Sequence, residues 1–202
     1  MAMPVRGITR LGIVAAISLS ISIPASLVAA QPGEVCQGGG NYEPASTTTR
    51  TIELPDLGIR VQIPENYRAM RMEDGSVRIV HPDDFRWLEC VARGGVGGGG
   101  YYFENIYRVE RDPGMNLMLQ ARYHLGSRVQ RDGSLFPAGI IQGRYQRSGL
   151  DGYIAREETG LGVAFLGTVN NSRYLIGISP RCDCDVTLDD LADLLSRVSA
   201  IP

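Results

Sequence analysis

Two kinds of hydrophobic periodicity run along the chain, and together they predict an α+β fold. Apolar and polar residues alternate strictly from Ile59 to Ile63, the pattern of a strand with one buried and one wet face. Near the end of the chain, apolar residues recur at the three- and four-residue spacing of one helix face: Leu188, Leu191, Ala192, Leu195 and Val198. This stripe predicts a C-terminal amphipathic helix that packs on a sheet, with Thr187 as its N-cap.

Short apolar or alternating runs between these two elements predict further strands, at residues 67–72, 77–80, 87–92, 106–109, 140–147, 152–157, 163–169 and 174–178. Turn-forming pairs separate several of them: Asp74-Gly75, Asp151-Gly152 and Asn170-Asn171. A second helix is expected from Pro113 to Leu125, capped by Asp112 and stopped by Gly126.

Runs of strands with helices between and after them indicate a mainly antiparallel sheet with helices packed on it. We therefore expect one α+β domain over residues 51–202. Most of its core should come from residues 59–63, 163–169, 174–178 and 188–198.

Residues 1–30 have the organisation of a signal peptide. Arg6 and Arg10 precede an apolar run from Leu11 to Ile23, and Val28-Ala29-Ala30 offers small residues for cleavage before Gln31. The alternative is an uncleaved anchor, since an apolar stretch of about twenty residues can span a bilayer. We favour cleavage, which leaves no membrane span, and interpret residues 31–50 as a polar linker held at Cys36.

Composition narrows the functional classes. The chain has 202 residues, and its twenty basic residues are all arginine, against 22 Asp and Glu. The formal charge of −2 excludes the basic footprint of a nucleic-acid-binding protein. The absence of lysine excludes a Walker-type phosphate loop and Schiff-base catalysis. After cleavage, eighteen arginines and twenty-two acids would remain, giving an acidic but ion-paired surface.

The strand Gly58–Pro64 running into Tyr67 is similar to the opening of PsbP-like α/β/α sandwich domains. The close of the chain resembles theirs as well, because Gly152-Tyr153 leads through two strands to the terminal helix. The resemblance covers most of residues 51–200 as a pattern and rests on no single motif. It implies an exported accessory or assembly protein without catalysis, in a periplasm or thylakoid lumen, and it transfers no functional residues.

Four cysteines follow the export segment: Cys36, Cys90, Cys182 and Cys184. An even number in an oxidising compartment predicts two disulfides, for which three pairings exist. Since a bridge between Cys182 and Cys184 would close a strained small ring, we expect each of them to pair with Cys36 or Cys90.

The Cys182-Asp183-Cys184 stretch also carries a chemical alternative. A helix N-terminus lowers the pKa of a nearby thiol, so cysteines just before the last helix could take part in thiol–disulfide exchange. A zinc site would need two further ligands, with only His81 and His124 to help Cys36 or Cys90. We favour structural disulfides and predict neither a metal nor another cofactor.

The glycine-rich segment 95–100 formally matches G-x-G-x-x-G, but it leads into Tyr101-Tyr102-Phe103 instead of a helix. We therefore expect a loop, not a dinucleotide site. Its residues nevertheless form a candidate ligand-binding lip, comprising Gly97, Gly100, Tyr101, Tyr102 and Phe103.

Two histidines limit the remaining catalytic options. His81 stands beside Asp83 and Asp84 and could serve as a general base, although His-Pro-Asp-Asp is interpreted here as a turn between two strands. His124 falls in the predicted second helix, and no G-x-S-x-G elbow is present.

The sequence thus predicts an exported, non-catalytic accessory or binding protein that meets a protein partner or small ligand in the cell envelope. Its location would be the periplasm, the thylakoid lumen or the extracellular space. The alternative is a thiol–disulfide oxidoreductase that uses Cys182 and Cys184.

Overall fold

The computed structural model describes residues 34–36, 43–98, 101–160, 162–182 and 184–202. A seven-stranded sheet dominates this part of the chain, with the order β3-β4-β5-β11-β10-β9-β8 and antiparallel pairing throughout. Its strands are β3 (Arg68–Arg71), β4 (Val77–Val80), β5 (Phe103–Val109), β8 (Gly139–Arg147), β9 (Leu150–Glu157), β10 (Val163–Val169) and β11 (Leu175–Arg181).

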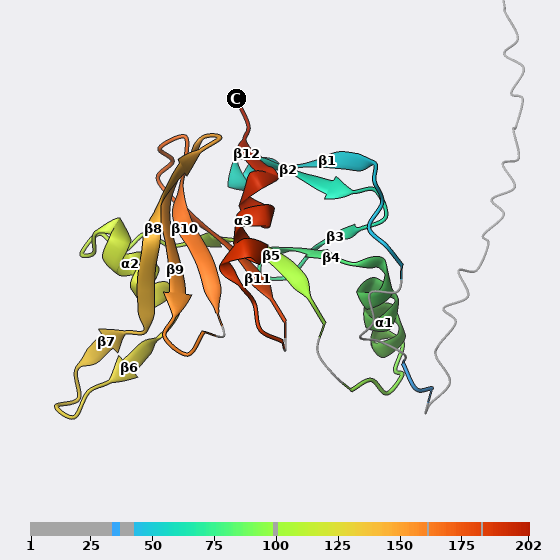
Figure 1. The fold of residues 1–202 in the computed structure, drawn as a ribbon, viewed down its shortest axis with the longest axis horizontal. Coiled ribbons are helices and arrows are strands. Elements are labelled where there is room, and N and C mark those ends of the chain that lie inside the picture. The colour runs from blue at the N-terminus through green and yellow to red at the C-terminus, as the bar shows by residue number, and fades with distance from the viewer. Residues whose placement is uncertain (1–33, 37–42, 99–100, 161, 183) are drawn as a thin grey trace, which may run out of the picture.

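A second, three-stranded sheet joins the two ends of the domain. Its order is β1-β2-β12, so the central strand pairs with the first and the last strand of the chain. The bounds are β1 (Thr49–Leu54), β2 (Ile59–Pro64) and β12 (Val198–Ala200), and a 3-10 turn, η1 (Pro55–Leu57), connects β1 to β2. A separate small hairpin of β6 (Ser127–Val129) and β7 (Leu135–Pro137) projects beyond the end of β8, away from the three-stranded sheet (Figure 1).

Three α-helices complete the described part of the chain: α1 (Pro82–Ala92), α2 (Leu117–His124) and α3 (Leu188–Ser196). Figure 1 shows α2 and α3 on opposite sides of the strands β8, β9 and β10, with the three-stranded sheet near the end of α3 and α1 beyond β4.

The main core lies between the seven-stranded sheet on one side and α3 with the three-stranded sheet on the other. Alternate residues of β2 point into it (Ile59, Val61 and Ile63), and all three are fully buried. They meet Leu191 and Leu194 of α3 in the same cluster. The alternating apolar residues of β2 and the apolar face of α3 therefore pack together in one layer.

The strand β10 is buried on both faces, which explains its continuous apolar sequence. Phe165 belongs to the main core, whereas its neighbours Ala164 and Leu166 face α2. There they pack with Ala121 and Leu125, so α2 covers the second face of the sheet.

This architecture confirms the α+β class, the antiparallel sheet and the C-terminal helix on it. The four segments expected to form the core contribute most of its fully buried side chains. The Asp74-Gly75 hairpin turn is also present, with Gly75 at φ 80°. The terminal helix ends sooner than predicted, at Ser196, because Val198 leaves it to pair with Val61 in β12.

The strand predicted at residues 87–92 is wrong, because these residues form the greater part of α1. The interpretation of His81-Pro82-Asp83-Asp84 as a turn between strands fails with it, since these residues open the helix. His81 is the N-cap, Pro82 takes the first helical position, and the two aspartates lie in the positive first turn. These start signals outweigh the short apolar run that follows.

Other boundaries also differ from expectation. The second helix begins at Leu117 instead of Pro113, because the Asn116 side chain caps it by accepting the Leu119 N–H. Asp151-Gly152 lies inside β9, and the preceding turn is formed by Ser148 and Gly149 instead. The strand β1 begins at Thr49, inside the segment expected to be linker, and β6, β7 and β12 were not predicted.

The predicted signal peptide, residues 1–30, lies outside the described residues. Within the described part, no helix has both the length and the apolar composition needed to cross a membrane.

Candidate functional site

The cysteines pair differently from the prediction. Cys36 bonds to Cys90 and Cys182 bonds to Cys184, with Cα separations of 5.7 Å and 5.1 Å. The first pair forms because the chain at Cys36 runs beside Val96, whose carbonyl accepts the Cys36 N–H at 2.9 Å. That contact holds Cys36 against the end of α1, where the helical conformation of residues 87–92 presents Cys90.

The two disulfides differ in exposure. Cys36 and Cys90 are buried, at 6% and 8%. Cys182 is half-buried and Cys184 is exposed, between the end of β11 and the start of α3. The second pair is therefore local in sequence and open to solvent.

Only part of the predicted ligand-binding lip is assembled in the structure. Tyr101 and Phe103 pack on each other with ring centroids 5.1 Å apart, and Trp87 of α1 lies 5.6 Å from Tyr101. Arg78 of β4 stacks over Phe103 and donates to the Tyr101 hydroxyl at 2.7 Å. Tyr102 turns to the other side of the sheet and joins the main core.

Of the two glycines in this lip, Gly97 is among the described residues. Gly97 lies against the Trp87 ring, so close that a side chain there would overlap the indole. Gly100 lies outside the described residues.

Neither histidine stands free for catalysis. His81 is buried, its Nε2 donates to the Glu43 carbonyl at 2.6 Å, and its Nδ1 accepts the Asp83 N–H at 3.2 Å. Both ring nitrogens are thus engaged by the backbone, and Nδ1 also lies 3.4 Å from an Asp83 carboxylate oxygen. Burial also raises the pKa of the adjacent Asp84.

His124 is placed on α2 against the sheet, where its Nε2 accepts from the Tyr107 hydroxyl of β5. Burial, assisted by the charge of Arg181, lowers the pKa of His124 to about 4. The ring is therefore neutral at physiological pH and acts as a hydrogen-bond acceptor within the packing of α2.

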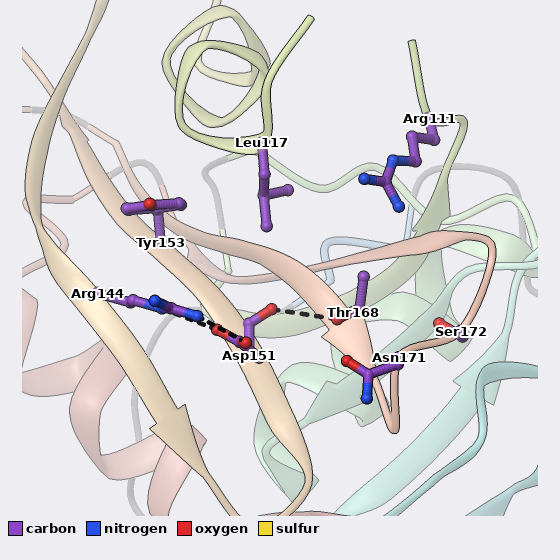
Figure 2. Close-up of a pocket in the computed structure, with 8 residues that line it drawn as sticks. All are labelled: Arg111, Leu117, Arg144, Asp151, Tyr153, Thr168, Asn171 and Ser172. Atoms are coloured by element: carbon purple, nitrogen blue, oxygen red, sulfur yellow. Dashed lines mark hydrogen bonds and ion pairs between the residues drawn. The ribbon is translucent and has the colours of Figure 1, made fainter. Parts of the chain in front are cut away.

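The sequence did not reveal a polar hollow of about 320 Å³ at the start of α2. Figure 2 shows its walls converging from the loop after β5, from α2 and from three neighbouring strands. It is lined by Arg111, Leu117, Arg144, Asp151, Tyr153, Thr168, Asn171 and Ser172.

The strand register explains how these side chains meet. Asp151 lies opposite Thr168 of β10, and Tyr153 of β9 lies opposite Arg144 of β8. Because side chains alternate along a strand, all four project to the face that α2 covers. The helix begins only at Leu117, so their polar ends remain uncovered where the sheet extends past it.

One ion pair forms the floor of the hollow. Arg144 donates from Nε and Nη2 to the two Asp151 oxygens, at 3.0 Å and 2.8 Å. This bidentate contact, first through its hydrogen bonds and then through the opposite charge, raises the pKa of Arg144. Asp151 is therefore neutralised by Arg144.

Arg111 enters from the opposite wall, toward Thr168 and Ser172 in Figure 2. Across the described ranges, no carboxylate lies within ion-pair distance of its guanidinium. Its five donors are thus left for solvent or a ligand.

An adjoining hollow of about 330 Å³ shares Asp151 and Asn171 and adds Arg147. Arg147 also lacks an ion pair to any described carboxylate. The first hollow holds the guanidinium groups of Arg111 and Arg144 and the carboxylate of Asp151, a local positive excess on a protein of net charge −2.

Two tight turns form the rim of this region. Asn170 and Asn171 have φ values of 45° and 59°, and Ser148 and Gly149 have 53° and 80°, the left-handed pairs of type I′ hairpins. The Asn170 N–H donates to the Gly149 carbonyl at 2.9 Å, which ties the turns together. Asn171 is held in place at the edge of both hollows.

The arrangement can hold a small anion. The Arg111 guanidinium and the Asn171 amide offer donors, while Leu117 and Tyr153 supply an apolar wall; the Thr168 hydroxyl already donates to the Asp151 carbonyl at 3.4 Å. One signal for this site was visible in the sequence, the Asn170-Asn171 turn. The gathering of distant arginines depends on a strand register that sequence patterns do not define.

No protein-family model matches the chain, and no curated protein sequence is significantly similar to it.

Proposed function

We propose that this protein is a non-catalytic binding protein that holds a small organic anion in the hollow between α2 and strands β8, β9 and β10. The ligand carries a carboxylate or phosphate group for Arg111 and an apolar or ring-shaped part for Leu117 and Tyr153. The supporting observation is Arg111, whose guanidinium faces the hollow without a carboxylate partner among the described residues.

Charge and size support the proposal. Since Arg144 already neutralises Asp151, an incoming anion meets the net charge of Arg111. A volume of about 320 Å³ suits a metabolite-sized ligand, not a polypeptide. The Asn170-Asn171 turn is held by a backbone hydrogen bond to Gly149, and such preorganisation lowers the ordering cost of binding.

Location and class follow from the earlier expectations. We place the protein in the cell envelope or outside the cell, because the first thirty residues have the pattern of a signal peptide and both cysteine pairs are disulfide-bonded. An accessory role, for which binding suffices, is also what the resemblance to PsbP-like domains implies.

The test is an NMR titration of the disulfide-bonded protein with benzoate, acetate and inorganic phosphate. We expect saturable shifts at the amides of Thr168, Asn171 and Ser172, with benzoate binding more tightly than acetate because its ring reaches Tyr153. Arg111→Gln should weaken binding about tenfold or more, the loss expected for a charged hydrogen bond.

Arg131→Gln is the matched control, since it removes one positive charge from the exposed turn of the β6–β7 hairpin. It should leave the affinity unchanged. If both variants weaken binding equally, the anion senses only overall charge and the proposed site is wrong. Absence of saturation with all three anions would also refute it.

A further inference from the structure

The Cys182–Cys184 disulfide contributes little as a structural cross-link. The entropy that a bridge removes from the unfolded chain grows with the length of the loop it closes, and this bridge encloses one residue. The Cys36–Cys90 bridge, with a sequence separation of 54, has the opposite character. Stabilisation of the fold therefore explains the buried disulfide but does not explain the local one.

The position of the local pair allows chemical access. Cys184 is exposed, whereas Cys182 is half-buried at the end of β11. A hollow of about 570 Å³ lies next in sequence to the pair and is lined by Asp185, Arg156 and Gly160. The exposure of Cys184 lets a thiol approach its sulfur, and exposed disulfides are the class that exchanges readily.

The two sulfurs are not equivalent. The Cys184 N–H donates to Cys182 Sγ, so a thiolate on Cys182 would keep a backbone donor. Cys182 is thus the better leaving group, and Cys184, the more exposed sulfur, is the one open to attack.

We propose that Cys182 and Cys184 form a redox-active pair that oxidises a dithiol on a polypeptide, independently of the anion site. A thiolate of the substrate attacks Cys184 Sγ, the S–S bond breaks, and Cys182 leaves as a thiolate that takes up a proton. The second substrate thiolate then attacks the substrate sulfur of the mixed disulfide and releases Cys184. Two electrons pass to the pair, the substrate gains a disulfide, and the protein ends with two thiols.

The first test uses the unaltered protein. It is equilibrated in a series of dithiothreitol buffers, alkylated, and both pairs are quantified by peptide mass spectrometry. We expect Cys182–Cys184 to be half-reduced at a reductant ratio at least about tenfold milder than Cys36–Cys90 requires. Equal reducibility of the two pairs would overturn the proposal, and this comparison requires no variant to fold.

The second test uses a reduced synthetic peptide with two cysteines as substrate. The protein should oxidise one peptide per chain, and Cys182→Ser with Cys184→Ser should abolish the reaction. Cys182→Ser alone should trap a mixed disulfide on Cys184 when offered the oxidised peptide, whereas Cys184→Ser should trap several-fold less on Cys182. Peptide oxidation that persists in the double variant, or equal trapping by the two single variants, would contradict the assigned roles.

Discussion

Arg197, just after α3, and Glu104, on β5, form a two-pronged ion pair beside the main core. Arg197 Nη1 lies 3.2 Å from Glu104 Oε2, and Nη2 contacts the other oxygen. Glu104 is 3% exposed. The same guanidinium reaches Asp193 one turn back and the Gln62 carbonyl of β2, so it joins the helix to both sheets.

Removing one partner of this pair should destabilise the fold more than removing both. Glu104→Leu leaves the Arg197 charge half-buried and should lower the free energy of unfolding by about 3 kcal/mol. Adding Arg197→Met should recover a substantial part of that loss. Urea unfolding of the two single variants and the double variant measures the coupling, and strictly additive losses would show that the pair contributes no interaction energy.

Acid should weaken the protein through His124. Its pKa is about 4 in the fold and near 6.5 when unfolded, so the native chain binds fewer protons between those values. The contribution of His124 to the free energy of unfolding is fully present above pH 6.5. It is lost as the pH falls toward 4, by up to about 3 kcal/mol. His124→Gln, which keeps an acceptor for Tyr107, should flatten the urea-unfolding free energy over this range. A variant as acid-sensitive as the parent would show that other groups control the loss.

Loss of the buried disulfide should be costly and loss of the exposed one mild. Cys36→Ser with Cys90→Ser releases a loop with a sequence separation of 54, worth about 4 kcal/mol of unfolding free energy. Cys182→Ser with Cys184→Ser is the matched control and should cost less than about 1 kcal/mol. Thermal and urea unfolding without reductant compare them, and similar losses would mean that the local bridge does stabilise the fold.

The start of α3 depends on a reciprocal cap. Thr187 Oγ1 accepts the Asp190 N–H at 3.2 Å, and the Asp190 carboxylate accepts the Thr187 N–H at 2.8 Å. Thr187→Ala should therefore cost about 1 kcal/mol in unfolding free energy. Thr159→Ala, which removes an exposed hydroxyl that donates to Glu157, should cost much less. Equal costs would indicate that the cap adds nothing beyond a surface hydrogen bond.

Prediction from the sequence succeeded where one physical rule dominated. The alternation in β2 and the stripe of α3 both reflect burial of one face. The structure buries Ile59, Val61 and Ile63 of β2 and Leu191, Leu195 and Val198 of the stripe, whereas Leu188 and Ala192 are exposed. Prediction failed where two rules competed: residues 87–92 suit a strand, yet the helix-start signals at His81 and Pro82 determine their conformation.

The site was harder to predict for a different reason. Arg111, Arg144 and Asp151 belong to separate elements, and only the pairing of β8 with β9 and the late start of α2 bring them together. The cysteine pairing was predicted incorrectly for two reasons. Residues 87–92 were expected to form a strand instead of a helix, and a small ring between Cys182 and Cys184 was assumed to be avoided.

The central position of β2 between β1 and β12 governs when the protein can fold. Val61 pairs with Val198, and the Gln62 N–H donates to the Arg197 carbonyl, so the main core is closed by residues made more than a hundred positions after β2. Contacts this distant in sequence must wait for the later segment, and they slow folding. A growing chain therefore exposes the apolar face of β2 until α3 and β12 have emerged, and the native core assembles only after synthesis has passed residue 200.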